Sequence, residues 1–244
     1  MMLTVPSGFK IEPGYKVATA GSCFAQHLAN GLQKSGFEYF VPEDNPALDA
    51  QTRKLHNYGI YSARYGNIYT TLQLLKMLQE AYELRQPQDQ VWQGKDGRFY
   101  DPYRPAIEPD GFESEAALRA SRETLYAAVR QIVEESDVFV FTLGLTETWR
   151  NRADGSVYPV VPGAVAGQFN PDQHEFLNMS HDQVRDSLGQ ALQFFSRSQL
   201  RHPLPADRVT GASGGHICRW PCAVFNHLLQ IRPAGRGQRD VKQL

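Results

Sequence analysis

The chain has 244 residues, of which 41% are hydrophobic, so it can form one domain with a sizeable core. Its formal net charge of −1 gives no reason to expect a nucleic acid as partner. The sequence shows neither a run of about 18 apolar residues, as a membrane span needs, nor the charged and apolar start of a secretion signal. Three cysteines are too few for a disulfide framework. We therefore expect a cytoplasmic protein.

The first clear elements are a strand and a helix joined by a short turn. Residues 16–20 form an apolar run that is typical of a buried strand. Apolar side chains then recur at helical spacing over residues 24–32, and Gly36 occupies the position of a helix C′ glycine. Gly21 and Ser22 are thereby predicted to form the strand-to-helix turn.

The remaining elements follow from hydrophobic periodicity and from turn residues. We predict a helix over 70–84, a hairpin over 91–100, a helix over 114–136, a buried strand over 137–144, a hairpin around Asp154-Gly155, and a helix that Ser180 and Gln183 begin with a capping box. Helices between the two buried strands favour an α/β fold with a parallel sheet and long loops.

Ser22 lies at a position that suits the nucleophile of an acyl-transfer reaction. In an open α/β sheet, ligands bind beyond the carboxyl ends of the strands, and Ser22 lies at such an end. Free N–H groups of the following helix could stabilise an oxyanion, but a serine hydroxyl needs a histidine base to become a nucleophile. Ser22 could equally be only the N-cap of that helix. Cys23 is expected to be a small buried residue, with a reactive thiol as the less favoured alternative.

The segment AGSCFAQHLANGL, residues 20–32, resembles the signature of the GSCFA family, a branch of the SGNH/GDSL-type hydrolases. Similar segments follow in order at residues 56–70, 96–105, 141–150 and 169–180, so that the likeness covers residues 10–195. The resemblance implies a flavodoxin-like, three-layer α/β/α fold with a parallel sheet. It also implies that Ser22 attacks an ester or acyl group, without a metal or nucleotide cofactor.

The same resemblance implies oxyanion donors from a second-block glycine and a third-block asparagine. The third block corresponds to residues 144–147 and departs from the usual Gly-x-Asn-Asp, with Thr146 and Glu147 as the polar pair. Thr146 could donate a hydrogen bond, whereas Glu147 could orient a base, bind substrate or simply face solvent. Gly66 could instead serve only as a turn glycine, and Arg104 could instead form a structural ion pair. The candidate oxyanion or substrate-binding residues are Gly21, Gly66, Asn67, Gly144, Thr146, Glu147, His56 and Arg104.

A catalytic histidine is implied near the C-terminus. Of the seven histidines, His216 is nearest to that position, and we take it as the candidate base. His56 could line the site, and His174 is expected in a loop. His216 with Cys218 and Cys222 would be an incomplete ligand set, so no metal site is predicted.

The last part of the chain differs in composition from the rest. Residues 1–186 carry a formal net charge of −7 and residues 187–244 one of +6, and no helical period is sustained beyond residue 195. We expect a GSCFA/SGNH-like domain over 1–195 and an atypical basic tail over 196–244. The tail could bind an acidic partner, could fold irregularly, or could be a disordered segment outside the family's reading frame.

A changed reading frame would explain the tail's composition. A segment like TTYSKSxLR, which relatives carry near this point, is absent. Residues 225–233 can be encoded so that the frame one nucleotide later reads Ser-Thr-Thr-Tyr-Ser-Lys-Ser-Asp. A frame change around residues 196–204 would leave the last strand and helix incomplete and would omit the native catalytic histidine.

These observations lead to two readings of the function. The first is an SGNH-like serine esterase or acyltransferase that acts on an acyl or acetyl ester, for which a carbohydrate or glycoconjugate is the suggested carrier. The second is a catalytically defective member or fragment that binds a glycan or a partner. The expected partner is a small-molecule or carbohydrate ester, and neither a nucleic acid nor a membrane is expected. The sequence indicates no oligomeric state.

Overall fold

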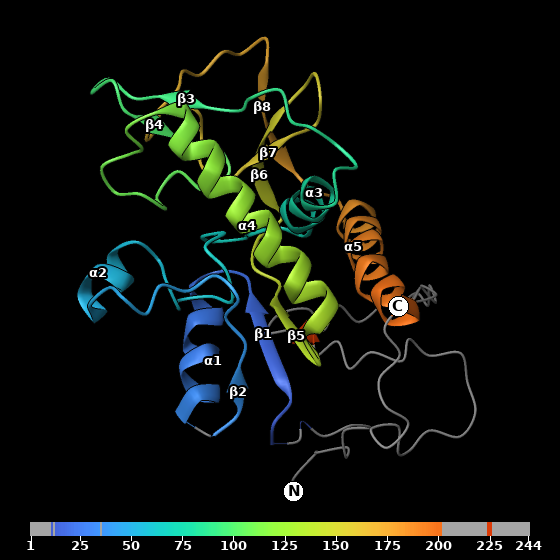
Figure 1. Ribbon diagram of the computed structural model, residues 1–244. Coiled ribbons are helices and arrows are strands. Elements are labelled where there is room, and N and C mark those ends of the chain that lie inside the picture. Colours follow the sequence, from blue (N-terminus) through green and yellow to red (C-terminus); the bar gives the residue numbers. More distant parts are fainter. Residues whose placement is uncertain (1–10, 12, 35, 202–223, 226–244) are drawn as a thin grey trace, which may run out of the picture.

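A parallel sheet forms the centre of the protein. The computed structural model describes residues 11, 13–34, 36–201 and 224–225 (Figure 1). The strand order is β2-β1-β5-β9, with bounds Glu38–Tyr39 for β2, Lys16–Ala20 for β1, Val138–Thr142 for β5 and Val224–Phe225 for β9. All neighbours are parallel, and Val17 pairs with Val138 at the start of the β1–β5 ladder. The predicted α/β class with a parallel sheet and the strand predicted over 16–20 are therefore confirmed.

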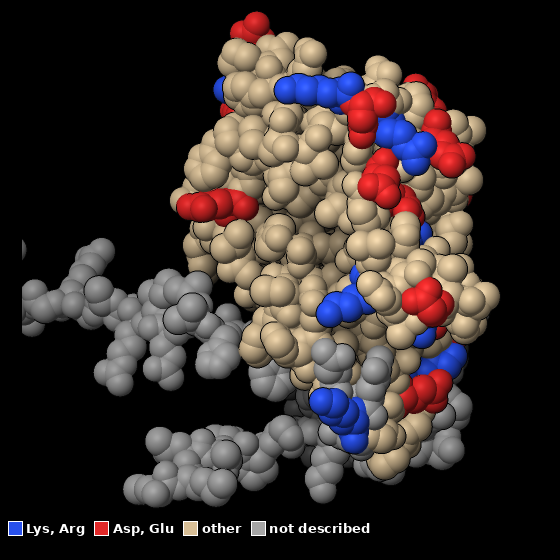
Figure 2. All heavy atoms as spheres, turned by 90° about the vertical axis from the view of Figure 1, so that its left-hand side faces the viewer, with Lys and Arg blue, Asp and Glu red and all other residues tan. Residues whose placement is uncertain are grey.

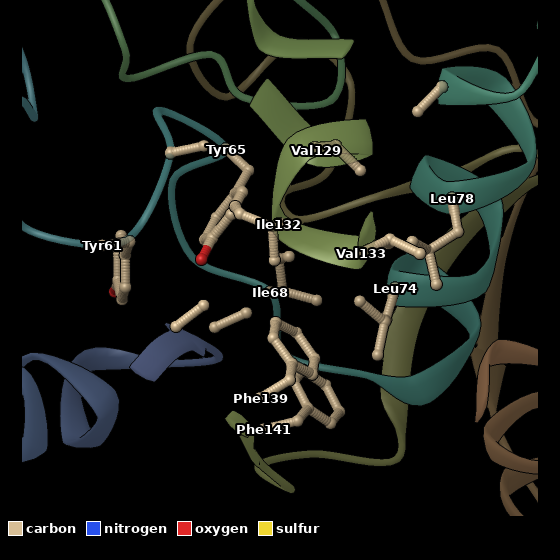
Figure 3. Packing of buried hydrophobic residues seen from close by; sticks show 14 of the residues in the cluster. Tyr61, Tyr65, Ile68, Leu74, Leu78, Val129, Ile132, Val133, Phe139 and Phe141 are labelled. Atoms are coloured by element: carbon tan, nitrogen blue, oxygen red, sulfur yellow. The ribbon is translucent and has the colours of Figure 1, made fainter. Parts of the chain in front are cut away.

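Helices pack on both faces of this sheet. They are α1 (Cys23–Lys34) on one face and α3 (Thr71–Ala81), α4 (Glu115–Glu135) and α5 (His181–Arg201) on the other, whereas the short helix α2 (Ala50–Leu55) has no buried residue. One face of β5 places Phe139 and Phe141 in the main core against α3, α4 and α5 (Figure 3). Its other face places Val138 and Val140 against Leu32 of α1. Among the helices of the described residues, none is long and apolar enough to cross a membrane.

The predicted helix starts are confirmed by their caps. Ser114 caps α4 by accepting from the Ala117 N–H at 3.1 Å. At α5, the Ser180 N–H donates to the Gln183 side chain at 2.8 Å, and the Gln183 N–H donates to Ser180 Oγ at 3.3 Å, which is a capping box. The helix α5 runs on to residue 201, beyond the point where the sequence shows a helical period.

A second, antiparallel sheet lies near the hairpin β3–β4, at the opposite end of the molecule from α1 and β1 (Figure 1). Its order is β7-β6-β8, with bounds Val157–Tyr158, Glu147–Asn151 and His174–Asn178, and the hairpin strands are Trp92–Gln93 for β3 and Phe99–Tyr100 for β4. Both predicted hairpins are present. The prediction of a loop at His174 is wrong, because this residue begins β8 and is 5% exposed.

Two predictions for the start of α1 are also wrong. Cys23 is exposed rather than buried, and Phe24, the first residue of the apolar spacing over 24–32 that predicted the buried face, is 48% exposed. The buried line of this helix passes through Ala25, Ala29 and Leu32. At about 100° per residue, Cys23 lies about 200° away from Ala25, and Phe24 lies at the margin of the buried face.

Candidate active site

The turn between β1 and α1 is shaped by Gly21. Its φ of +140° is rarely adopted by residues with a side chain, and a Cβ at this position would lie 2.0 Å from Thr142 Oγ1. The Ser22 N–H donates to the same Thr142 hydroxyl at 3.3 Å. On the opposite side, the Ile68 N–H donates to the Gly21 carbonyl at 2.9 Å. The ends of β1 and β5 and the loop before α3 therefore converge at Ser22.

The Ser22 hydroxyl is accessible and has room beside it. Ser22 is half-buried, and its Oγ forms no hydrogen bond with the part of the chain that the structure describes. A side chain on Gly144 would place its Cβ 3.8 Å from Ser22 Oγ and 3.2 Å from the Tyr69 carbonyl. Gly144 thus leaves space next to the hydroxyl. The first-turn bond of α1 runs from the Ala25 N–H to the Ser22 carbonyl.

Gly66 and Asn67 lie directly before the residue that bonds to Gly21. Gly66 has a φ of +66°, which suits a glycine turn, and Asn67 is half-buried. The Asn67 carbonyl accepts from the Gln73 side chain at 2.9 Å. The loop is therefore held beside the serine turn through its main chain.

The third block lies between β5 and β6, and both members of its polar pair adjoin Asn178 of β8. Residues 144–147 are exposed, and Glu147 begins β6. The Thr146 hydroxyl donates to Asn178 Oδ1 at 2.8 Å, so its proton is engaged with β8. Glu147 pairs with Asn178 across the same ladder.

His56 and Arg104 belong to the scaffold of the neighbouring loops. His56 Nδ1 lies 2.6 Å from Glu108 Oε2, and the same carboxylate pairs with Arg64. Arg104 is 3% exposed, and its guanidinium is 3.0 Å from the carboxylate of Asp101. The Cβ of Arg104 would lie 3.8 Å from a Cβ on Gly66. Arg104 thus forms the structural ion pair that was the alternative for it, and it supports the Gly66 turn.

No histidine of the described residues is hydrogen bonded to Ser22. His174 Nδ1 accepts from the Asn170 N–H at 3.1 Å, and its Nε2 is 3.7 Å from an Asp89 oxygen. His27 and His181 are exposed on α1 and α5. His216, the candidate base, lies outside the described residues.

A scan against protein-family models matches the GSCFA family over residues 16–202, which is most of the chain. The chain belongs to the GSCFA family. Comparisons with curated proteins and with solved structures find no match. The GSCFA match contains the serine turn, the Gly66 loop and the third block, and it ends within one residue of the end of α5.

This GSCFA protein has two further features that the sequence did not indicate. The first is a side-chain hydrogen-bond chain from Gln26 of α1 through Tyr61 to Asn67. The second is an exposed aromatic group on the β6–β8 ribbon. Phe169 and Phe176 are 45% and 54% exposed, and their rings stand at 81° and 67° to the ring of Trp149. In the sequence, the signal for this aromatic group is the alternation of side chains that strands over 147–151 and 174–178 would place on opposite faces of a sheet.

Proposed function

We propose that this GSCFA protein is a serine esterase or acyltransferase with a flavodoxin-like, three-layer fold of the SGNH type. The observation that carries the proposal is the position of Ser22. Its hydroxyl is accessible at the carboxyl end of a central parallel strand, on a turn that only glycine at position 21 allows. Helices on both faces of the sheet support the three layers.

In the proposed reaction, Ser22 Oγ attacks the acyl carbonyl and transfers its proton to a histidine. His216 is the proposed base. The carbonyl oxygen becomes an oxyanion that N–H donors near the start of α1 and in the Gly66–Asn67 loop stabilise. The leaving alcohol takes the proton as the acyl-serine forms, and water or an acceptor hydroxyl then releases the acyl group.

The β6–β8 ribbon supports a carbohydrate as the carrier of the ester. Trp149 and Phe176 are a cross-strand pair, and Glu147 with Asn178 is the next pair on the same face, about 7 Å closer to the serine turn. Aromatic rings can pack against the C–H face of a sugar, and the carboxylate and amide can bind its hydroxyls. The face of the molecule seen in Figure 2 has a broad area with few charged side chains, which suits an uncharged ester.

Hydrolysis of p-nitrophenyl acetate by the full chain tests the enzyme proposal. Ser22→Ala is expected to lower kcat by about 10⁴–10⁶-fold, since a nucleophile and its base act as one unit. Cys23→Ser is the matched control at the neighbouring exposed position and is expected to keep wild-type activity. Activity that survives Ser22→Ala but is lost in Cys23→Ser would assign the chemistry to the thiol instead.

The second candidate is a non-catalytic glycan-binding protein. It is favoured by the absence of a histidine partner for Ser22 among the described residues. It predicts binding of acetylated oligosaccharides in calorimetry with no turnover and with equal affinity for wild type and Ser22→Ala. Turnover by wild type excludes it.

A further inference from the structure

We propose that Gln26 and Tyr61 are positioning residues that turn the side-chain amide of Asn67 toward Ser22 as an oxyanion donor. The inference rests on the proposed serine chemistry and adds a hydrogen-bond chain that would orient one oxyanion donor. The third block lacks the asparagine that the family resemblance implies as an oxyanion donor, so another group has to supply that hydrogen bond.

Two of the donors expected near Ser22 already have partners in the protein. The Ser22 N–H donates to Thr142 Oγ1 at 3.3 Å, and the Thr146 hydroxyl donates to Asn178 at 2.8 Å. An oxyanion needs N–H or O–H donors that are aimed at it before the reaction begins. Asn67 directly precedes Ile68, whose N–H binds the Gly21 carbonyl beside Ser22, so its side-chain amide is a candidate donor in addition to the N–H groups at the start of α1.

The hydrogen-bond chain sets the direction of that amide. Gln26 Nε2 donates to the Tyr61 hydroxyl at 2.9 Å, and the Tyr61 hydroxyl donates to Asn67 Oδ1 at 2.5 Å. Because Oδ1 is the bound end, the Nδ2 group is the free end of the Asn67 amide. No bond from Nδ2 to another described residue is formed.

The Tyr61 hydroxyl is a constant donor over the working pH range. Burial raises the pKa of Tyr61 to about 12, although the hydrogen bond from Gln26 opposes this rise. The phenol is therefore protonated at neutral pH and keeps its proton for Asn67. Tyr61 is 1% exposed, and its hydroxyl is bound on both sides, by Gln26 and by Asn67.

The chain ends next to the nucleophile. Gln26 is four residues after Ser22 and lies in the first turns of α1, so its side chain leans toward the N-terminus of this helix, where Ser22 lies. Figure 3 shows Tyr61 between its own loop and the ribbon of α1. The main chain of Asn67 is fixed as well, because the buried side chain of Gln73 bonds to the Asn67 carbonyl at 2.9 Å and to the Tyr69 N–H at 3.0 Å. The Asn67 residue is thus held at its side chain by Tyr61 and at its main chain by Gln73.

The test measures kcat and KM for an ester together with the rate of labelling by a fluorophosphonate. Asn67→Ala is expected to lower kcat by about 10²–10³-fold, as the loss of one oxyanion donor does. Tyr61→Phe removes only a hydroxyl, and misorientation of the donor is expected to lower kcat by about 10–100-fold with KM nearly unchanged. In the Asn67→Ala background, Tyr61→Phe should cause no further loss.

Tyr58→Phe is the matched control, because Tyr58 is in the same loop and its hydroxyl binds Arg64 at 3.1 Å instead. It should leave both rates at the wild-type value. If Tyr61→Phe does not fold, Gln26→Ala repeats the test at a half-buried helix position that alanine suits. Wild type that neither turns over nor labels refutes the proposed function itself. Active wild type with unchanged rates in Tyr61→Phe or Gln26→Ala, whatever the change in Tm, overturns this inference alone.

Discussion

Gly21 connects the backbone of the first turn to the chemistry of Ser22. A Cβ at this position would meet the Thr142 hydroxyl at 2.0 Å and the Thr142 Cβ at 3.1 Å. Moving Thr142 away would also break the bond that it accepts from the Ser22 N–H. The same residue therefore determines how closely β1 and β5 approach and where the Ser22 hydroxyl lies.

We predict that Gly21→Ala lowers the free energy of unfolding by about 2–4 kcal/mol, because overpacking adds to the strain of a positive φ. Urea denaturation measures this change. Gly189→Ala is the control, since an added Cβ there meets nothing within 4 Å and the site is an exposed position of α5. That control should raise stability by about 1 kcal/mol. Equal stability of Gly21→Ala and wild type would show that the turn is not closed as described.

On the scale of elements, α4 is attached to the loop after β4 by a buried ion cluster. Asp101 is 1% exposed and binds both Arg104 at 3.0 Å and Arg122 at 2.9 Å. Burial alone would raise the pKa of Asp101, but Arg122 and Arg104 outweigh it and hold this pKa below its ordinary value. The stabilisation is therefore present above the unfolded-state pKa of about 3.9 and is lost as the pH falls through the lower folded-state pKa.

Asp101→Asn is expected to destabilise the protein by about 3–5 kcal/mol at neutral pH, since it leaves two buried cations without their partner. The difference from wild type should shrink as the pH is lowered below about 4. Urea midpoints over a pH series measure both effects. Glu115→Gln, which removes an exposed pair with Arg119 at 3.7 Å, is the control and should change stability by at most about 0.5 kcal/mol. A constant difference at all pH values would contradict the assignment.

The β6–β8 ribbon is the second element with a function assigned to it. Phe176→Ala should raise KM for an acetylated oligosaccharide by about fivefold, because a ring contact contributes about 1 kcal/mol. The kinetics with p-nitrophenyl acetate, which lacks the sugar that the ribbon is proposed to bind, should stay the same. Leu84→Ala, at a residue that is 66% exposed, is the control for loss of an exposed apolar side chain. Equal effects on both esters would argue against a sugar-binding role.

At the scale of the whole molecule, local patterns made most of the fold predictable. The run over 16–20 and the caps at Ser114 and Ser180 are encoded within a few residues, so their elements lie where the sequence places them. The edge strand β8 was missed because Phe176 points to solvent while His174 is buried, which reverses the usual pattern.

The candidate site was predictable only in its local part. The turn at Ser22 follows from adjacent residues. The bond between Gln26 and Tyr61 spans 35 positions and that between His56 and Glu108 spans 52, and no periodicity within a single segment encodes such pairs. The role of the tail likewise depends on residues outside those described.

The family match ends at residue 202, within the interval where we propose a change of reading frame. The nucleotide sequence tests this proposal. In the next frame, the codons of residues 225–233 should read Ser-Thr-Thr-Tyr-Ser-Lys-Ser-Asp, and a GCG codon at Ala234 would extend this to Leu-Arg. A next frame that does not encode this segment would show that residues 196–244 are the chain's own C-terminal part.

The most direct measurement of the central claim is the mass of the full chain after reaction with a fluorophosphonate, followed by peptide mapping. The account predicts one adduct per chain, located on Ser22 and absent from Ser22→Ala. No adduct on the folded wild type, or an adduct that persists in Ser22→Ala, would contradict the claim that Ser22 is a nucleophile.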